Sequence, residues 1–375
     1  MSSANNDEVI SRASPHTIKK FELIEAYVKT WAQKLLNNQY CNGLVFIDCM
    51  CNSGEYYDDN HQQVFGTAVR VSKVLREAAG QYPNKQIYLY FNDISADKVH
   101  HLEQLIEKDK SNFHIHTSVR DGNELLKKMG QSLMRMTNVH YLLVYDPYDA
   151  NIDWNAVYPF FNSWGEVIIN HALMDSTRAV KMAKSDAAVS KYEGTYQMKI
   201  GDLSTYGSDR AAYESRIEDI IKALRRDNTR DYFIAAAPFF NKKNTIVYNL
   251  IHCTSNIAGF RLYKKSAWQT FGGQSSTKDT HGDENQLSFD VTGKFSVTTT
   301  TDEDCYHITD IAKYLQNQFN GQEKVPLNTV WNALDRHPIF PYDCYRNEIK
   351  RELKQLYGAQ VSRSKISFST GENKI

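Results

Sequence analysis

The chain has 375 residues, a length that predicts one large core domain with a smaller domain appended to it. Its formal net charge of zero excludes a global electrostatic attraction to nucleic acid or membrane, so such a partner would have to meet a local patch. The sequence has no run of about 18 apolar residues, no secretory signal and no disulfide framework among its six cysteines. We therefore expect a cytoplasmic protein with reduced thiols and no membrane partner.

The first element is an amphipathic helix. Residues 1–15 are polar and are expected to form a loose tail. Between residues 16 and 36, apolar side chains recur every three or four positions, as they do along one face of a helix. The polar stretch that follows, which includes Asn42 and Gly43, ends this pattern.

Strands and helices then alternate along the chain. Short apolar runs predict strands at 44–48, 86–93, 113–119, 140–148 and 166–172. Helical periodicity predicts helices at 67–79, 95–109, 122–134 and 155–164. Continuous apolar strands alternating with helices are typical of a parallel sheet covered on both faces. The sequence therefore predicts a doubly wound, Rossmann-like α/β domain that spans residues 16–301.

The second half of this domain is less regular. Residues 175–212 are polar and carry both charge signs, and 211–226 is expected to be a helix. Two apolar runs at 232–241 and 245–255, joined by a short turn, predict an antiparallel hairpin that closes the sheet. A further helix is expected at 259–271, followed by a loop around a short hairpin between 286 and 298.

Residues 302–375 have a different character. Three expected helices, at 306–320, 327–336 and 343–357, precede a two-stranded segment, which is the pattern of a winged helix-turn-helix domain. Basic residues on the third helix and in the wing are candidates for nucleic-acid contact: Arg346, Lys350, Arg351, Lys354 and Lys365. The alternatives are an ordinary solvated helix face, or a module that docks another protein.

Polar residues follow each of the first four expected strands. They are Asp48, Asn52 and Gly54, then Asp93, then Asp121 and Asn123, and finally Asp146. In an open parallel sheet the ligand lies outside the carboxyl ends of the strands. An acid after the second strand suits ribose hydroxyls, and the segment after the third strand suits an adenine edge. This layout, together with the antiparallel hairpin, is that of an S-adenosylmethionine-binding methyltransferase fold.

Two other kinds of site are disfavoured. A dinucleotide fingerprint has three glycines in the first loop, and only Gly54 is present, so NAD or FAD is not expected. Cys49 and Cys51 would point the same way in an extended segment. A metal site would need two more ligands at suitable spacing, so we expect packed thiols and no metal.

Several segments resemble the three-Cys-motif partner (TcmP) family of bacterial and phage-associated proteins. The resemblance covers roughly residues 16–370 and is carried by "FIDCMCNSGEYY" (46–57), "YDPYDANIDWNAV" (145–157) and "VYNLIHCTSNIAGFRLYKKSAW" (247–268). It implies a methyltransferase-like domain with a C-terminal winged helix, and a partner with a radical-SAM-like three-cysteine motif. The family's first loop reads D-x-F-A-G-P-G-x-Y, and here its middle glycine is Asn52.

The segment Asp146-Pro147-Tyr148 is similar to the D-P-P-Y of enzymes that methylate nucleic-acid amines. That similarity implies that Asp146 and the Pro147 carbonyl accept hydrogen bonds from an exocyclic amine, while Tyr148 stacks on a flipped base. The structural alternative is a strand end followed by a turn. Two functions stay open: a transferase that uses S-adenosylmethionine on or with nucleic acid, and an inactive adaptor that binds DNA or the three-Cys partner.

Overall fold

The computed structural model describes residues 9–107, 111–133, 136–147, 151–171, 186–199, 232–240, 246–276 and 305–370. The helix expected at 211–226, the hairpin expected between 286 and 298, and Tyr148 lie outside these ranges. Within them, no helix is long and apolar enough to cross a membrane.

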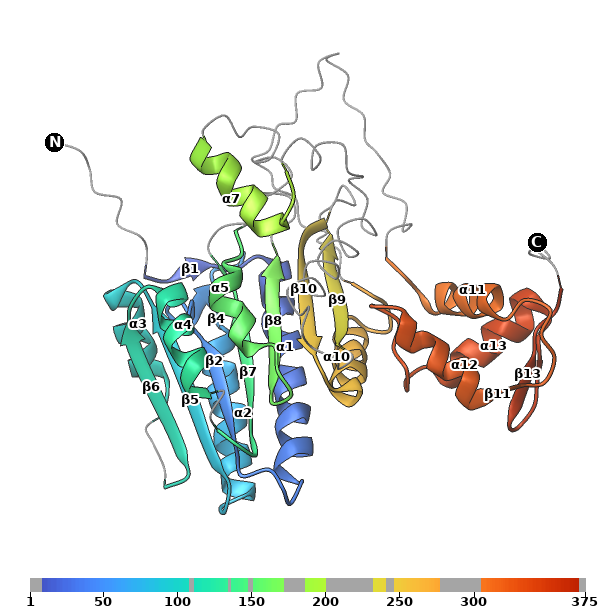
Figure 1. The fold of residues 1–375 in the computed structure, drawn as a ribbon, viewed down its shortest axis with the longest axis horizontal. Helices are drawn as coiled ribbons and strands as arrows, with labels where there is room; N and C mark the ends of the chain where they lie inside the picture. The colour runs from blue at the N-terminus through green and yellow to red at the C-terminus, as the bar shows by residue number, and fades with distance from the viewer. Residues whose placement is uncertain are drawn as a thin grey trace, which may run out of the picture.

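A seven-stranded sheet forms the centre of the molecule, in the order β6-β5-β2-β7-β8-β10-β9 (Figure 1). The strands are β2 (Gly43–Asp48), β5 (Gln86–Asp93), β6 (Phe113–Val119), β7 (Val139–Tyr145), β8 (Gly165–His171), β9 (Phe233–Phe240) and β10 (Ile246–Thr254). Neighbours from β6 to β8 pair in parallel, whereas β10 is antiparallel to both β8 and β9. The α/β class and the antiparallel closing hairpin predicted from the sequence are confirmed.

Helices cover both faces of this sheet, and successive residues of β2 point to opposite faces. Leu44 and Phe46 join the apolar cluster under α1 (Pro15–Leu36), α2 (Thr67–Gln81) and α10 (Ile257–Thr270). Val45 and Ile47 join the cluster under α4 (Gly122–Leu133) and α5 (Trp154–Val157), which continues into η1 (Tyr158–Phe160). At the edge of the sheet, α3 (Ala96–Leu105) begins at the cap residue Ser95, as the sequence predicts.

A small second sheet, in the order β1-β3-β4, was not predicted from the sequence. It consists of β1 (Ser11–Arg12), β3 (Glu55–Tyr57) and β4 (Gln63–Phe65). The chain that leaves the loop after β2 thus pairs at once with the segment before α1, where Ser14 caps the helix. Strands of two or three residues carry too little periodicity to be recognised in a sequence.

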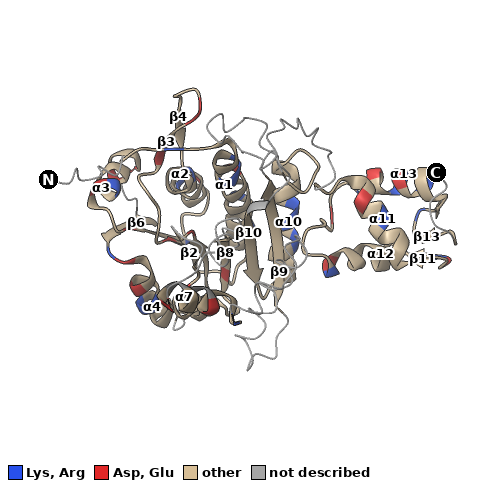
Figure 2. Cartoon of the chain, turned by 90° about the horizontal axis from the view of Figure 1, so that it is seen from above, with Lys and Arg blue, Asp and Glu red and all other residues tan. Residues whose placement is uncertain are grey.

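The C-terminal unit contains three helices and a three-stranded sheet in the order β11-β13-β12. Its elements are α11 (Ile308–Gln318), β11 (Val325–Pro326), α12 (Leu327–Ala333), η2 (Leu334–Arg336), α13 (Arg346–Tyr357), β12 (Gln360–Val361) and β13 (Lys365–Ser367). It packs against α10, where the Trp268 indole N–H donates to the Ile339 carbonyl at 2.9 Å and Arg261 pairs with Asp335. Figure 2 shows both signs of charge on this unit.

Candidate functional site

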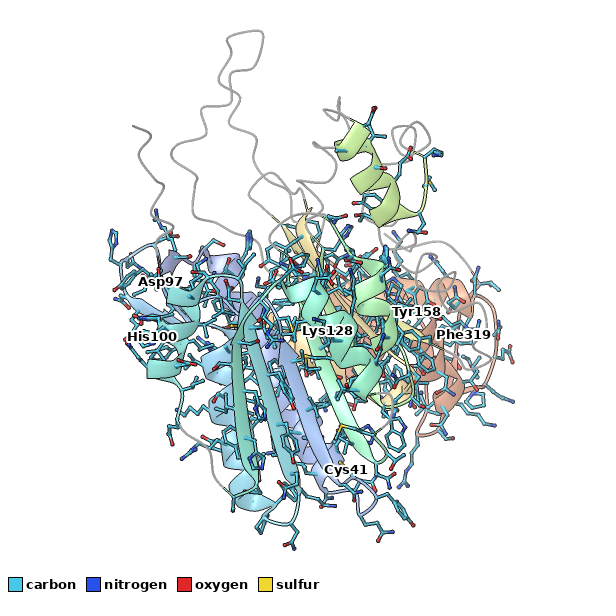
Figure 3. All side chains as sticks on the ribbon, turned by 60° about the vertical axis from the view of Figure 1, so that its left-hand side comes forward. Cys41, Asp97, His100, Lys128, Tyr158 and Phe319 are labelled. Atoms are coloured by element: carbon cyan, nitrogen blue, oxygen red, sulfur yellow. The ribbon has the colours of Figure 1, made fainter. Side chains whose placement is uncertain are left out.

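The carboxyl ends of the parallel strands meet at one edge of the sheet. Two residues labelled in Figure 3 identify the two edges. Cys41 precedes β2 at one edge, and Asp97 follows β5 at the other. Asp48, Asp93 and Asp146 all come at or directly after strand ends at the second edge. The structure therefore brings together the acidic residues of the first, second and fourth strands.

The loop after β2 keeps a tight conformation with a single glycine. Asp48 accepts the Met50 backbone N–H at 3.2 Å. Asn52 has φ of +58°, in the left-handed region that asparagine tolerates better than other non-glycine residues. Gly54, at φ +76°, has no room for a side chain, since a Cβ there would lie 2.5 Å from Leu102. Asn52 thus occupies a position with the left-handed backbone that a glycine would adopt without strain.

Two side chains at the end of β5 hold this loop in place. Asn92 donates to the carbonyls of Cys49 and Arg120, at 3.0 and 2.9 Å. Asp93 accepts the backbone N–H of Asn52 at 3.0 Å and that of Ser95, also at 3.0 Å, with one oxygen each. Asp93 is only 1% exposed. In this structure the Asp93 carboxylate supports the loop. Its contact with a ribose stays a prediction.

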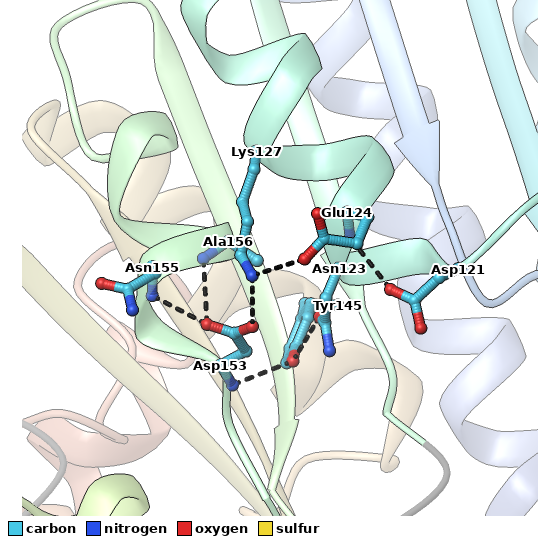
Figure 4. Close-up of polar contacts among 8 residues, drawn as sticks. All are labelled: Asp121, Asn123, Glu124, Lys127, Tyr145, Asp153, Asn155 and Ala156. Carbon is cyan, nitrogen blue, oxygen red and sulfur yellow. Dashed lines mark hydrogen bonds and ion pairs between the residues drawn. The ribbon is translucent and has the colours of Figure 1, made fainter.

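Asp121 and Asn123 belong to a polar network at the start of α4 (Figure 4). Exposed Asp121 accepts the backbone N–H of Glu124, at 2.9 Å. Asn123 accepts the Tyr145 hydroxyl at 3.0 Å, and that hydroxyl in turn accepts the Asp153 N–H. Asn123 therefore points toward the end of β7.

The two cysteines of the loop point to opposite sides of the sheet. Cys49 lies in the apolar cluster with Val45, whereas Cys51 lies in the cluster with Leu44. The expectation that they point the same way was wrong, because the segment after Asp48 is a turn and not an extended strand. Burial raises the pKa of both thiols. No metal-binding group of three or more His, Cys, Asp or Glu occurs in the described part of the chain.

Asp146 is the centre of a second polar cluster. It accepts the Lys20 ammonium at 2.6 Å and the Asn170 amide N–H at 2.7 Å. The Lys20 side chain is 11% exposed and that of Asp146 is 29% exposed. Pro147 is half-buried beside it. Asp146 is therefore held in one orientation by a cation and an amide while part of it stays open to solvent.

Burial and charge raise the proton affinity of Asp48. Its pKa is raised to about 7, first because the carboxyl is buried and second because Asp146 lies nearby, while Met50 N–H and Lys20 act in the opposite direction. The pKa of Tyr56 is raised by burial and then by Asp146. At neutral pH this part of the edge therefore contains a mixture of neutral and ionised Asp48.

An apolar surface lies beside these acids. Ile94, directly after Asp93, is 67% exposed, and Val119, which pairs with Asp93, is 47% exposed. Exposed large aliphatic side chains at the carboxyl edge of such a sheet offer an apolar contact. They could not be identified from the sequence, because a single apolar residue at a strand end is indistinguishable from a core residue.

The basic residues of the C-terminal unit fall into two groups. The Arg346 guanidinium lies 5.3 Å from the Trp331 ring and 4.9 Å from the Tyr342 ring, and it donates to the Tyr342 carbonyl. Half-buried Lys350 also lies over Trp331, at 5.9 Å. The exposed residues are Arg351, Lys354 and Lys365. Arg346 is therefore a structural residue of this unit as well as a candidate for nucleic-acid contact.

Sequence reasoning missed Lys20 and Tyr248. Lys20 lies on the apolar face of α1, 126 positions before Asp146 in the chain, and Tyr248 is one aromatic residue within an apolar strand. Only the fold shows that both approach Asp146. A lysine within the apolar stripe of the helix is the one signal that the sequence contained.

Neither a protein-family model nor a curated protein sequence matches this chain. Among solved structures it is similar to human methyltransferase-like protein 13 in complex with SAH (TM-score 0.32, 9% identity, 72% of this chain and 98% of that chain). It is also similar to loganic acid methyltransferase with SAH (TM-score 0.29, 8% identity, 68% and 83%). Both likenesses are distant and concern the fold alone.

Proposed function

We propose that the chain is a methyltransferase-like protein that binds S-adenosylmethionine at the carboxyl ends of β2 and β5. The observation that carries the proposal is the strand order, in which antiparallel β10 lies between β8 and β9. A mixed sheet of this kind separates the chain from the all-parallel dinucleotide-binding sheet. Its loop after β2 has one glycine, which suits a cofactor without a pyrophosphate.

The apolar surface of Ile94 and Val119 supports a purine at this edge. An adenine ring covers apolar side chains with its face and presents nitrogen donors and acceptors at its rim. Asp121, two residues after Val119, is exposed and can accept from an amino group. Asp48 and Asp93 are buried and accept backbone N–H groups of the loop that the cofactor's ribose and tail would contact.

Calorimetric titration with S-adenosylmethionine and S-adenosylhomocysteine tests this proposal. Micromolar binding is expected, and Ile94→Asp is expected to weaken it at least about tenfold, because a carboxylate would replace the apolar contact. Tyr40→Ala is the matched control, since Tyr40 is also an exposed hydrophobic residue, at 70%, but precedes β2 at the other edge. Absence of binding at millimolar ligand would contradict the proposal.

For the chemistry, we propose that the acceptor is an exocyclic amine of a nucleic-acid base. Asp146 has two oxygens that each accept one bond in the structure, so each retains capacity for another. Pro147 offers its carbonyl next to it, and Tyr148, outside the described residues, is the candidate stacking ring. A base would have to leave its stack to reach this edge.

For the C-terminal unit, we propose a winged helix that contacts nucleic acid through α13 and the β12–β13 hairpin. The order α11, β11, α12, α13, β12, β13, with β13 between the other two strands, supports it. Charge reversal of exposed Arg351 and Lys354 should lower the salt dependence of DNA binding by about one counterion per charge. An unchanged salt slope would remove this face from the interface.

The second candidate is an inactive adaptor on the same fold. The burial of Asp93, with both oxygens already accepting backbone N–H groups, favours it. Such a protein would bind DNA or a radical-SAM-like three-Cys protein and no cofactor. DNA or partner binding by a chain that does not bind S-adenosylhomocysteine would identify this function.

A further inference from the structure

The cluster around Asp146 contains two buried polar atoms whose hydrogen-bonding capacity is unmet. The Asn170 side-chain oxygen and the Tyr248 hydroxyl are both buried, and neither has a hydrogen-bond partner among the described residues. An unpaired buried polar group is costly, and native proteins keep few of them. Two such atoms beside one carboxylate indicate a site that a ligand completes.

The two atoms belong to the same side of the sheet. Asn170 pairs with Leu250 across the antiparallel β8–β10 ladder, and Tyr248 lies two residues before Leu250. Side chains at these positions share one face. Lys20 approaches from α1 on that face, with its ammonium 5.7 Å from the centre of the Tyr248 ring. Lys20 and Asn170 therefore contact Asp146 on the face of the sheet that also bears Tyr248.

Their chemistry fixes which partner atom each one needs. The Asn170 NH2 must face the Asp146 carboxylate, which can only accept, so the Asn170 oxygen is left as an acceptor. The Tyr248 hydroxyl can donate to an unprotonated nitrogen. The Lys20–Asp146 pair has no net charge, so a neutral ligand suits the site. The complementary ligand presents an N–H group beside a ring nitrogen.

We propose that Lys20, Asp146, Asn170 and Tyr248 form a binding site for the amino-bearing edge of a nucleobase, of the kind that cytosine and adenine present. Uracil and hypoxanthine present the reverse pattern, a carbonyl beside a ring N–H, and place that carbonyl against the Asn170 oxygen, which can only accept. This inference deepens the proposed function by naming the residue that selects amino-bearing bases, and it rests on that function for the meaning of the site. Asn170 is the specificity residue, and the Tyr248 hydroxyl adds a hydrogen bond that either kind of base can meet.

Nucleoside titrations of the full chain, followed by NMR, test the site, and the cytidine–uridine pair needs no cofactor. Cytidine is expected to bind at least about tenfold more tightly than uridine, because a site built for a hydrogen-bond donor rejects the analogue that lacks it. Adenosine and inosine are compared in saturating S-adenosylhomocysteine, so that adenosine cannot report on the cofactor position. Discrimination in either pair supports the inference.

Tyr248→Phe removes only the hydroxyl and should weaken cytidine and uridine binding by similar factors, because the hydroxyl can donate to one base and accept from the other. The thermal midpoint should stay unchanged or rise, because an unpaired buried hydroxyl is lost. Tyr263→Phe is the matched control: that hydroxyl donates to the Leu250 carbonyl at 3.1 Å, so its loss should lower the midpoint and leave both affinities unchanged. Equal binding within each nucleoside pair, nucleoside affinities that Tyr248→Phe leaves unchanged, or no saturable binding at millimolar nucleoside would each overturn the inference. The cytidine–uridine comparison does not depend on whether S-adenosylmethionine binds.

Discussion

The carboxyl edge of the sheet has two halves that are built differently. At the ends of β2 and β5, Asn92 and Asp93 are buried, and every side-chain oxygen and amide group that they carry is bonded to a neighbouring group of the chain. At the ends of β7 and β8 and the start of β10, the groups around Asp146 include an amide oxygen and a hydroxyl without partners among the described residues. The half at β2 and β5 therefore has a loop held in one conformation. The half around Asp146 keeps hydrogen-bonding groups that a ligand could meet.

This difference separates two roles that a strand-end acid can have. A satisfied buried carboxylate such as Asp93 organises a loop on which a cofactor can lie. A carboxylate such as Asp146, oriented by a lysine and an amide and still partly exposed, is suited to contact a reacting group.

The largest effect is expected from Asn92→Leu, which removes three hydrogen bonds and leaves the Cys49 and Arg120 carbonyls without that donor. We expect a loss of about 5 kcal/mol in the free energy of unfolding, measured by urea denaturation. Asn112→Leu is the matched control at the opposite edge, where the amide also donates to three carbonyls.

Both variants should be destabilised, but only Asn92→Leu should lose affinity for S-adenosylhomocysteine under conditions where it is folded. Full cofactor affinity in folded Asn92→Leu would show that the loop conformation is not what the cofactor requires.

Asp48→Asn should stabilise the protein in a pH-dependent way. The folded pKa of Asp48, about 7, lies above the unfolded value of about 3.9, so the folded state holds a proton that the unfolded state releases. The contribution of Asp48 to the free energy of unfolding is therefore largest below about pH 4 and falls as the pH rises through 7. The free energy of unfolding of the variant should exceed that of wild type by about 4 kcal/mol at pH 8 and by almost nothing at pH 4. A gain that is equal at both pH values would contradict this assignment.

Lys20→Met should lower the free energy of unfolding by about 2 kcal/mol. The loss is smaller than for a fully buried ion pair, because Asp146 is partly exposed. Adding Asp146→Asn should restore most of the loss, since the stranded carboxylate is then neutral. A double-mutant cycle of thermal or urea unfolding measures this coupling. Simple additivity of the two changes would mean that the ion pair does not organise this half of the edge.

The smallest effect is expected in the loop after β2. Asn52→Ala should cost about 1 kcal/mol, because alanine has no side chain to compensate the left-handed backbone and also loses the bond from the Ser53 N–H. Asn52→Gly should stay within about 0.5 kcal/mol of wild type. Equal losses in the two variants would show that the side-chain bond, and not the backbone conformation, selects asparagine here.

Most of the central sheet could be predicted because its strands are long enough to show a pattern. The predicted limits of β5 and β6 coincide with those in the structure, and Ser95 was identified as the start of the following helix. The strands of the β1-β3-β4 sheet and β11 were missed, since two or three residues carry no periodicity. The turn that separates Cys49 from Cys51 was also missed.

The site was predicted only where it follows strand ends. Asp48, Asp93 and Asp146 could be placed at one edge because parallel strands deliver their ends together. The sequence could not show that Asp93 is enclosed by backbone N–H groups, nor that Lys20 reaches Asp146 from the helix before the sheet. Such contacts depend on how distant segments pack, and no local pattern records them.

The most direct test is a methyl NMR titration of the full chain with S-adenosylhomocysteine and then cytidine. The division of the edge predicts that the cofactor product shifts the Ile94 and Met50 methyl resonances, because these side chains lie at the β2–β5 half. Cytidine, added afterwards, should bind without moving Ile94 further. No shift at Ile94 with S-adenosylhomocysteine, or displacement of one ligand by the other, would contradict the account of one edge with two separate halves.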